Sequence, residues 1–481
     1  MNPSQTLADS VPVPAGRGNF LLRTVPAVLA TWRQGPLSLT NLNAYAFGLS
    51  AVFTGVGSGV MPLLIAGLTD RGRIHFLWMD LDKNGGIAIV SLAGLIMAAL
   101  IQPVAGFLSD RSRTAFGQRT PFMAFGALGL TGAILSLGFA DTFLSMFAVT
   151  VALQAFGNLI QGPANALLID HVPPARIGAS AGLLNVYKVA GAGLFVVTLL
   201  LLMNNYDRET GQAWPWLWAS LGLVLAVMLA TVSWTISSLR PRKGRKPAPA
   251  FGQDEQVRRA SSAGAPPEGR KTSALRGPYA LFLVSLVFVV GAMSAMQVYS
   301  IPFLEDAAGL EQPALGAALL ALVLAVSTVA VAVPAGRLQD RFGHKALLIA
   351  AGAFGGAGAL LLLVASSLVQ VMLIGVPVGI SIGIFISVTW AMANGLVPKS
   401  RAARNLGYTS IATLVGAALA RLAGPGIDAL NANTPKLGYQ VMLGAIALAF
   451  VIAPVLLTRV GTGPGGRISA RQGHAVREGD R

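Results

Sequence analysis

The segment GFLSDRSRTAFGQRTPF, residues Gly106–Phe122, separates two long apolar runs and is rich in charged and turn-forming residues. A shorter version, GRLQDRFGHK, occurs at Gly336–Lys345, again between two apolar runs. Glycine, aspartate and arginine recur in the same order and spacing in both segments. The rest of the chain is therefore interpreted as two copies of one unit, each built around one such segment.

The internal repeat extends beyond these two segments. Four residues, approximately Ser112–Ala115, are extra in the first copy, so that Phe116-Gly117 corresponds to Phe342-Gly343. Further along, Val172-Pro173, Arg176, Gly182 and Gly191 correspond to Val397-Pro398, Arg401, Gly407 and Gly416 at one constant offset. An ordered set of matches with one small insertion predicts two halves in the same orientation, that is, parallel repeats.

The composition is that of a membrane protein. Of the 481 residues, 54% are hydrophobic and only 11% are charged, and the mean hydropathy is +0.65. In a typical soluble protein about a quarter of all residues are charged. Apolar runs of about 20 residues, long enough to cross about 30 Å of hydrocarbon, recur along the chain. The predicted fold class is an all-α polytopic membrane protein.

Twelve transmembrane helices are predicted, in two sets of six. The expected spans are residues 41–67, 85–109, 121–140, 142–169, 178–203 and 214–239, then 278–304, 313–336, 346–366, 368–394, 405–430 and 436–458. The expected organisation is an N-terminal segment 1–40, an N-terminal half 41–239, a linker 240–277, a C-terminal half 278–460 and a tail 461–481. The linker is rich in Arg, Lys, Pro, Ser and Gly and predicts a flexible connection.

The distribution of positive charge predicts the orientation. Most of the 35 Lys and Arg residues fall in the two terminal segments, the linker and the loops on the same side. The loops on the other side contain only Arg71, Arg73, Lys83, Arg208 and Lys436. By the positive-inside rule both termini and the linker are cytoplasmic, in a multi-pass protein of the cell (inner) membrane. The net charge of +16 thus reflects topology and not nucleic-acid binding.

Several functions are excluded by the residues themselves. The chain has no cysteine, and its four histidines fall in predicted loops or tails without ligand spacing. No nucleophile–base or metal constellation is present, so neither an enzyme, a cofactor nor a metal is expected. The N-terminus lacks an apolar stretch of the signal-peptide kind, so no cleaved signal peptide is expected.

The paired motif resembles a known family. The pattern G-x-L-x-D-R-x-G-x-K/R between the second and third spans of each half resembles the signature loop of the major facilitator superfamily. The longer first copy, with Gln161–Pro173 (QGPANALLIDHVP) and the following Arg176, resembles more narrowly the glycoside–pentoside–hexuronide cation symporters and the sucrose transporters. The resemblance implies a transporter that works by alternating access, with a sugar or glycoside as substrate.

The charged loop residues are interpreted as a gating motif. An aspartate at the end of a span can accept hydrogen bonds from a neighbouring helix start, while an arginine pairs across the bundle. One copy would suggest loop charges only, but two equivalent copies favour a latch that holds the halves in one conformation. The predicted motif consists of Gly106, Asp110, Arg111, Gly117 and Arg119, with Gly336, Asp340, Arg341 and Gly343 in the second copy.

Polar side chains inside the spans are the candidates for substrate binding. Gln154, Asn158, Gln161 and Asn165 follow one face of the fourth span. Such a face predicts a substrate cavity, and the helix order of the superfamily agrees; hydrogen bonding between helices is the alternative, at about 0.6–2 kcal/mol per contact. The remaining candidates are Asn185, Tyr187 and Lys188 in the fifth span, Gln297, Trp390, and Arg421 in the eleventh span.

No Asp or Glu lies in the middle of a predicted span. The symporters that the chain resembles place carboxylates within their second and fourth spans, so sodium coupling is not expected. Proton coupling through a carboxylate at the end of a span and plain facilitation both stay open. The expected partners are a small-molecule substrate, a proton and the lipid bilayer, and the protein is expected to be a monomer.

Two other functions stay open at this stage. An exporter of organic anions or drugs is favoured if Lys188 and Arg421 form an anion site. A non-transporting membrane receptor or scaffold rests only on the linker, residues 240–277, which resembles a disordered segment more than a domain.

Overall fold

The computed structural model describes residues 39–69, 72, 74–112, 114, 116–172, 177–206, 214–239, 278–396 and 402–459. Within these residues, twelve helices are long and apolar enough to cross a membrane, as predicted. The spans run over Leu39–Thr69, Lys83–Arg111, Thr120–Leu137, Phe143–Leu168, Gly182–Met203, Trp214–Ser238, Pro278–Val298, Pro313–Val331, Arg341–Val364, Leu368–Thr389, Tyr408–Asn433 and Leu437–Arg459.

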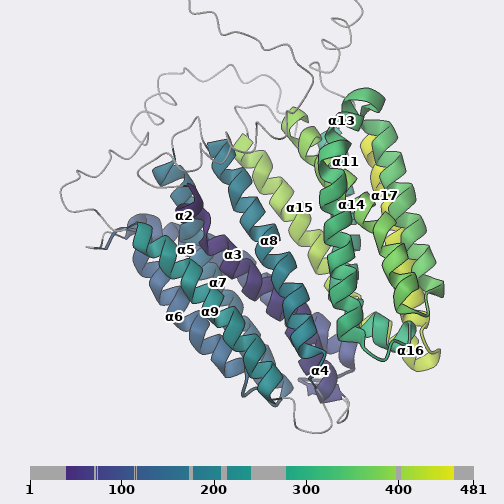
Figure 1. Ribbon diagram of the computed structural model, residues 1–481, viewed down its shortest axis with the longest axis horizontal. Coiled ribbons are helices and arrows are strands. Elements are labelled where there is room, and N and C mark those ends of the chain that lie inside the picture. The colour runs from purple at the N-terminus through teal and green to yellow at the C-terminus, as the bar shows by residue number, and fades with distance from the viewer. Residues whose placement is uncertain are drawn as a thin grey trace, which may run out of the picture.

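The spans form two groups of helices side by side (Figure 1). The N-terminal half consists of α2 (Leu39–Asn43), α3 (Tyr45–Ser50), η1 (Ala51–Val60), α4 (Met61–Thr69), α5 (Lys83–Arg111), α6 (Thr120–Leu137), α7 (Phe143–His171), α8 (Ile177–Met203) and α9 (Trp214–Ser238). The C-terminal half consists of α11 (Pro278–Val298), α12 (Ser300–Pro302), η3 (Phe303–Ala307), α13 (Pro313–Leu361), η4 (Leu362–Val364), α14 (Leu368–Leu396), α15 (Ala402–Leu422), α16 (Gly424–Asn433) and α17 (Leu437–Arg459).

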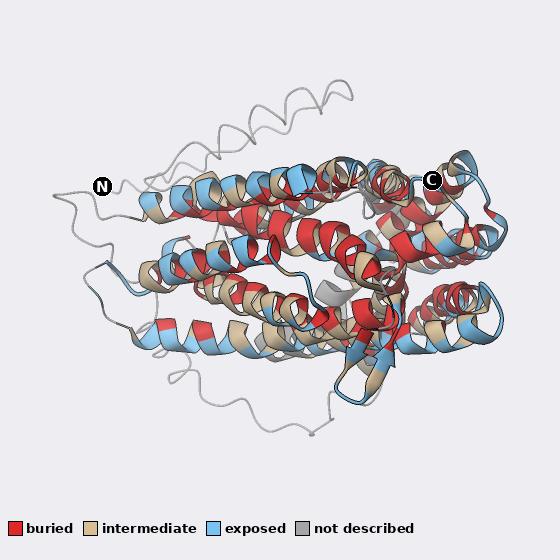
Figure 2. Ribbon diagram, turned by 90° about the horizontal axis from the view of Figure 1, so that it is seen from below, coloured by how far each residue is buried: buried red, intermediate tan, exposed pale blue. Residues whose placement is uncertain are grey.

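The two halves meet along two pairs of helices. In one pair α8 packs against α13, and in the other α5 packs against α15 and α16. Buried residues face the interior of each helix group, while the outer faces are exposed (Figure 2). These outer faces carry large apolar side chains such as Leu128, Val329, Val369 and Leu373. In a bilayer such side chains contact lipid, which is the solvent that a polytopic protein of this composition requires.

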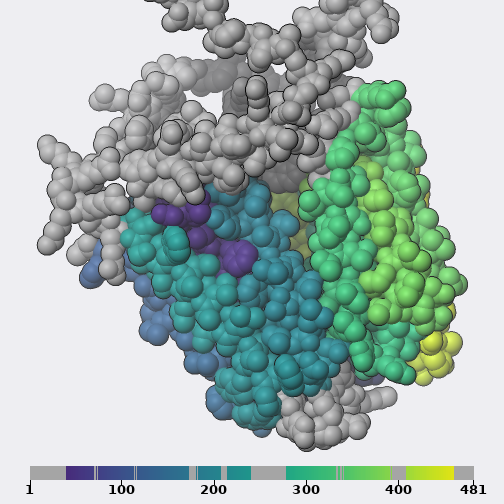
Figure 3. Space-filling model, in the orientation of Figure 1, coloured from purple at the N-terminus to yellow at the C-terminus, as the bar shows by residue number. Residues whose placement is uncertain are grey.

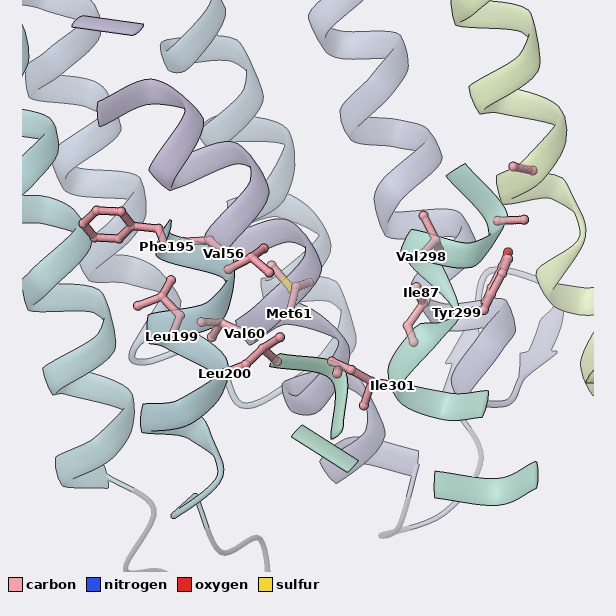
Figure 4. Packing of buried hydrophobic residues seen from close by; sticks show 14 of the residues in the cluster. Val56, Val60, Met61, Ile87, Phe195, Leu199, Leu200, Val298, Tyr299 and Ile301 are labelled. Atoms are coloured by element: carbon pink, nitrogen blue, oxygen red, sulfur yellow. The ribbon is translucent and has the colours of Figure 1, made fainter. Parts of the chain in front are cut away.

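Three spans are less regular than their apolar runs predicted. The first contains a π-helix, η1, which packs against α8 through Val56, Val60, Phe195 and Leu199 (Figure 4). The seventh was expected to be continuous over 278–304, but it is interrupted at Tyr299 before the short α12 and η3. The eleventh, expected over 405–430, is broken at Ala423 between α15 and α16.

The second copy of the signature segment contains a sharp change of direction. A turn between spans 313–336 and 346–366 was expected, and α13 consists of two helices joined at a kink, where Gly343 is outside helical geometry (φ 79°, ψ 158°). The spans on either side of the kink are Pro313–Val331 and Arg341–Val364. Gly117, which corresponds to Gly343 in the repeat, also has a positive φ of 94°. Only glycine takes such angles at little cost, so the matched glycines serve the same change of direction in both halves.

An outer hairpin was not predicted. Strand β1 (Ile74–Phe76) pairs antiparallel with β2 (Met79–Leu81), and the two-residue turn exposes Leu77 and Trp78. Phe76 packs against Phe143 at the start of α7, with ring centroids 5.2 Å apart. Strands of three residues are too short to produce a detectable alternation of polar and apolar side chains.

The repeat is also visible in helix packing. At Gly191 in α8 the helix lies so close to α3 that an added Cβ atom would collide with the Phe47 carbonyl oxygen. At Gly416 in α15 an added Cβ would lie 2.5 Å from the Val287 carbonyl oxygen of α11. These glycines correspond to one another in the sequence repeat. Each lets the fifth helix of its half approach the backbone of the first.

We expect Gly191→Ala to destabilise the protein by about 1–3 kcal/mol, because α8 must move away from the Phe47 carbonyl. Gly193→Ala is the matched control on the same helix, since a Cβ there meets nothing within 4 Å. Thermal unfolding of both variants in detergent measures the effect. Equal stability of the two variants would show that the close approach at Gly191 is not needed.

Candidate functional site

A cavity of about 150 Å³ lies where the two halves meet. Most of its wall comes from the first span, α5 and α7, and two side chains come from the C-terminal half. The two halves form separate blocks in the space-filling view (Figure 3). The lining residues are Val52, Phe53, Val56, Gly57, Ser58, Met61, Pro62, Ile65, Ile87, Val90, Ser91, Gly94, Leu95, Ala98, Thr150, Leu153, Gln154, Val298 and Arg421.

The four amide side chains predicted to share one face of α7 lie in different surroundings. Gln154 lines the cavity, and the buried Asn158 Nδ2 donates to the Gln154 backbone oxygen (2.8 Å) and to its Oε1 (3.2 Å). Asn165 lies outside the cavity, where its Oδ1 accepts a hydrogen bond from the Tyr45 hydroxyl (3.0 Å). Gln161 is half-buried and does not line the cavity. Of the four predicted amides only Gln154 therefore lines the cavity, and Asn158 is hydrogen-bonded to it.

Arg421 is the charged residue of the cavity wall. Its Nη1 donates to the Ala417 carbonyl oxygen of its own helix (2.8 Å). Its Nε is buried and has no hydrogen-bond partner, and none of the ion pairs among the described residues includes it. Asp428, on the neighbouring helix α16, is bound to other groups. The cavity thus contains a guanidinium group without a carboxylate partner.

The other substrate candidates lie outside the cavity wall. On α8, Asn185 is exposed, whereas Tyr187 and Lys188 are half-buried. Gln297 adjoins the cavity, because its Nε2 donates to the hydroxyl of Ser58 (3.1 Å), which lines it. Trp390 belongs to α14, but its side chain lies outside the part of the chain that the structure describes.

Two gating residues of the first copy, Asp110 and Arg119, belong to a cluster centred on the buried Arg119, while Asp110 itself is exposed. Arg119 Nε donates to Asp170 Oδ2 (2.9 Å), and its Nη1 donates to Ser109 Oγ (2.6 Å) and to Asp110. Burial alone would lower the pKa of Arg119, but the hydrogen bonds and charges of Asp170 and Asp110 outweigh it and raise this pKa. The guanidinium therefore keeps its charge.

This cluster joins the ends of α5, α6 and α7 within one half, and it does not connect the two halves. Arg111 does not pair across the bundle as suggested; it lies over the Phe107 ring of its own helix, 3.9 Å from the centroid. In the second copy Arg341 lies over Phe342 (5.3 Å), while the side chain of Asp340 lies outside the described residues. Asp170 was not predicted to belong to the motif, although its place at the end of a span was visible.

A second polar cluster joins the halves at the end of the molecule that carries the β-hairpin, here called the hairpin end. Lys83 Nζ pairs with Asp306 Oδ1 (2.6 Å) and with Glu305 Oε2 (3.4 Å) of η3. The Tyr439 hydroxyl donates to Asp306 Oδ2 (2.5 Å), which links α17 to the same group. The sequence did not predict this cluster, because Lys83 and Asp306 are 223 residues apart and Asp306 and Tyr439 are 133 residues apart.

The N-terminus of α5 is bound to α16 at the same end. The Gly85 backbone N–H donates to Asp428 Oδ2 (2.6 Å), and Asn84 Nδ2 donates to Asp428 Oδ1 (2.8 Å) and to the Tyr439 hydroxyl (3.0 Å). Gly424 lies against the Asn84 carbonyl oxygen with no room for a side chain. The hairpin end is thus closed by direct backbone and side-chain contacts between the halves.

The family model described as Major Facilitator Superfamily matches residues 80–333 and 313–478. The chain belongs to this superfamily. The two matches overlap and together cover most of the chain, which agrees with the two helix groups in Figure 1.

Relatives within the superfamily differ in what their names say they carry. The chain is 29% identical over 165 residues to the general alpha-glucoside permease of Schizosaccharomyces pombe, covering 30% of each protein. It is 34% identical over 104 residues to a sucrose transport protein of Oryza sativa subsp. indica, covering 17% of this chain and 21% of the relative. The chain therefore spans less than a third of the length of these two relatives.

A longer match is to a multi-drug resistance efflux pump of Streptococcus pneumoniae. It is 24% identical over 378 residues and covers 76% of this chain and 82% of the pump. Sugar carriers and drug pumps thus both occur among the similar proteins.

Solved transporter structures share the fold. A peptide transporter in complex with sulfate superimposes with a TM-score of 0.63 at 12% identity, covering 88% of this chain and 96% of that one. A mutant of the nucleoside transporter NupG gives 0.60 at 11% identity, covering 88% of this chain and 100% of that one. At such identities the likeness concerns the fold alone.

Proposed function

We propose that the protein carries a sugar or glycoside across the cell membrane by alternating access. The observation that carries this proposal is the cavity between the halves, whose wall includes Gln154 together with Val298 and Arg421 of the C-terminal half. Contacts between the halves close the hairpin end. The relatives that are named as glucoside and sucrose carriers support the substrate class. The protein is proposed to act as a monomer.

The hairpin end is proposed to face the outside. The positive-inside rule places the termini and the linker in the cytoplasm, which puts the β-hairpin, η3 and α16 on the opposite side. In Figure 1, α4 and α16 lie at the bottom, where the halves approach each other. With the contacts of Asn84, Gly85 and Asp428 made, the structure corresponds to a state in which the cavity is closed to the outside.

The cavity chemistry suits a polar, neutral ligand. An amide offers both a donor and an acceptor, so Gln154 can bind a sugar hydroxyl in either sense. The bond from Asn158 to Gln154 Oε1 fixes the orientation of this amide. Apolar residues such as Val52, Val56 and Leu153 complete the wall and suit the apolar faces of a sugar ring.

One observation favours a second candidate, an exporter of organic anions or drugs. Arg421 brings an unpaired guanidinium to the cavity wall, and a carboxylate or sulfate group on the ligand would compensate its charge. The similarity to the drug efflux pump supports the same candidate. The two candidates differ in whether the ligand must be charged.

We expect Gln154→Ala to raise the KM for sugar uptake about tenfold, which corresponds to the loss of one hydrogen bond of about 1.4 kcal/mol. Gln161→Ala is the matched control, since this amide lies on the same helix but outside the cavity. Uptake of labelled glucosides into vesicles measures both.

Arg421→Gln and Lys188→Gln should leave the uptake of a neutral glucoside intact. An equal loss with Gln154→Ala and Gln161→Ala would contradict the proposed site.

If the substrate is instead an organic anion, Arg421→Gln abolishes its transport while neutral sugars show no flux in any variant. Failure of every tested sugar and anion to cross in reconstituted protein would remove both candidates. A stable cytoplasmic binding partner of the linker would then favour a receptor or scaffold.

The Arg119 cluster is proposed to make the cytoplasmic ends of α5, α6 and α7 move as one body during the conformational change. Asp110→Asn removes one of the two carboxylates of Arg119 and leaves Asp170 in place. We expect normal membrane insertion but a turnover about tenfold or more lower, as for the loss of a charged hydrogen bond of about 1.5–3 kcal/mol. Asp141→Asn, an exposed carboxylate in the loop after α6, is the control. Unchanged turnover of Asp110→Asn would refute the gating role.

A further inference from the structure

Asp428 is a carboxylate at the hairpin end that is bound only by groups of the other half, and the ion pairs among the described residues do not include it. The groups that bind it, Gly85 N–H and Asn84 Nδ2, are neutral donors, and both belong to the other half of the protein. Its side chain is half-buried. An ionised carboxylate removed from water without a counter-charge is costly, and binding a proton relieves that cost.

The N-terminus of α5 supplies the attraction that holds this carboxylate. Gly85 is in the first turn of α5, where backbone N–H groups have no acceptor within the helix. Asp428 provides that acceptor from α16, so the C-terminal half caps a helix of the N-terminal half. The interaction depends on negative charge, because a helix N-terminus carries partial positive charge.

None of the described titratable groups around Asp428 forms an ion pair with it. Lys83 of α5 pairs with Asp306 and Glu305 of η3, and Asp82 caps α5 by accepting from the Lys83 N–H. On α17, the Tyr439 hydroxyl bonds to Asp306 and Asn84, and Lys436, just before this helix, donates to the Ala307 carbonyl. Tyr299 donates to the Arg421 carbonyl. Arg421 itself donates to the Ala417 carbonyl.

We infer that Asp428 is the binding site of a coupling proton, and that proton binding opens the hairpin end. The inference rests on the proposed transport function. A proton from the water outside adds to one carboxylate oxygen, the negative charge at the N-terminus of α5 disappears, and one acceptor is lost. The contact between α5 and α16 weakens and the halves separate at the hairpin end. When the carboxyl group returns its proton to water, the carboxylate again accepts hydrogen bonds from Asn84 and Gly85, and the hairpin end closes.

A distance measurement between the halves tests the inference without any substrate. The chain has no cysteine, so Leu77→Cys at the hairpin tip and Asn433→Cys at the end of α16 attach two spin labels selectively. Both positions are exposed. In the otherwise unchanged protein, the main distance is expected to lengthen as the pH falls from about 8 to about 5, where carboxyls in altered surroundings titrate.

In the same labelled protein Asp428→Asn is expected to show the long distance at every pH. Asp306→Asn is the matched control: it also removes a carboxylate of the cluster, but the pH response persists because Asp428 remains. A wild-type response in Asp428→Asn, or its loss in Asp306→Asn alone, would overturn the assignment.

A second variant covers the case in which Asp428→Asn does not fold. Asn84→Asp places a like charge beside Asp428 and is expected to move the distance change to higher pH; an unchanged midpoint counts against the inference. The outcome is separable from that of the proposed function. Sugar flux with no pH-dependent distance removes the proton site alone, whereas a pH-dependent distance without flux of any sugar removes the substrate assignment alone.

Discussion

The lipid bilayer is the constraint on which the rest of this structure depends. In hydrocarbon every backbone N–H and C=O group must be paired within the protein, which leaves helices as the available form for long apolar segments. The irregular stretches are therefore informative. The π-helix η1, the interruption at Tyr299 and the break at Ala423 all lie in helices that surround the cavity or close its hairpin end. The helices thus depart from regular α-helical geometry where they line the cavity or contact the other half.

Among the described residues, most polar contacts between the halves lie at the hairpin end, whereas helices within each half pack closely at particular glycines. Gly191 and Gly416 bring the fifth helix of each half against the backbone of the first, so each half is a compact body. The halves themselves are joined at the hairpin end by Lys83, Asn84 and Gly85 through replaceable hydrogen bonds. Rigid bodies joined by few polar contacts are suited to rocking around a central site.

Charge placement separates structural from functional groups. Arg119 is buried but satisfied by two carboxylates, so it stabilises the ends of three helices. Arg421 is at the cavity without a carboxylate, and Asp428 is at the interface without a cation. In the functions proposed above, each of these two charged groups binds a partner from outside the chain. Arg421 binds a ligand, and Asp428 binds a proton. An ion pair between Arg421 and Asp428 would compensate both charges, and neither group would then need a ligand or a proton.

The number of spans, the two-fold repeat and the family motif follow from the sequence alone, because hydrophobicity, charge and local spacing are properties of contiguous residues. The matched glycines Gly117 and Gly343 were visible in the same way. Only the tertiary structure decided that Gln154 reaches the cavity while Asn165 bonds to Tyr45, although both lie on one helix face. It alone joined Asn84 to Asp428, because a hydrogen bond between residues so far apart in sequence depends on how whole helices pack, and no local pattern of residues records that arrangement.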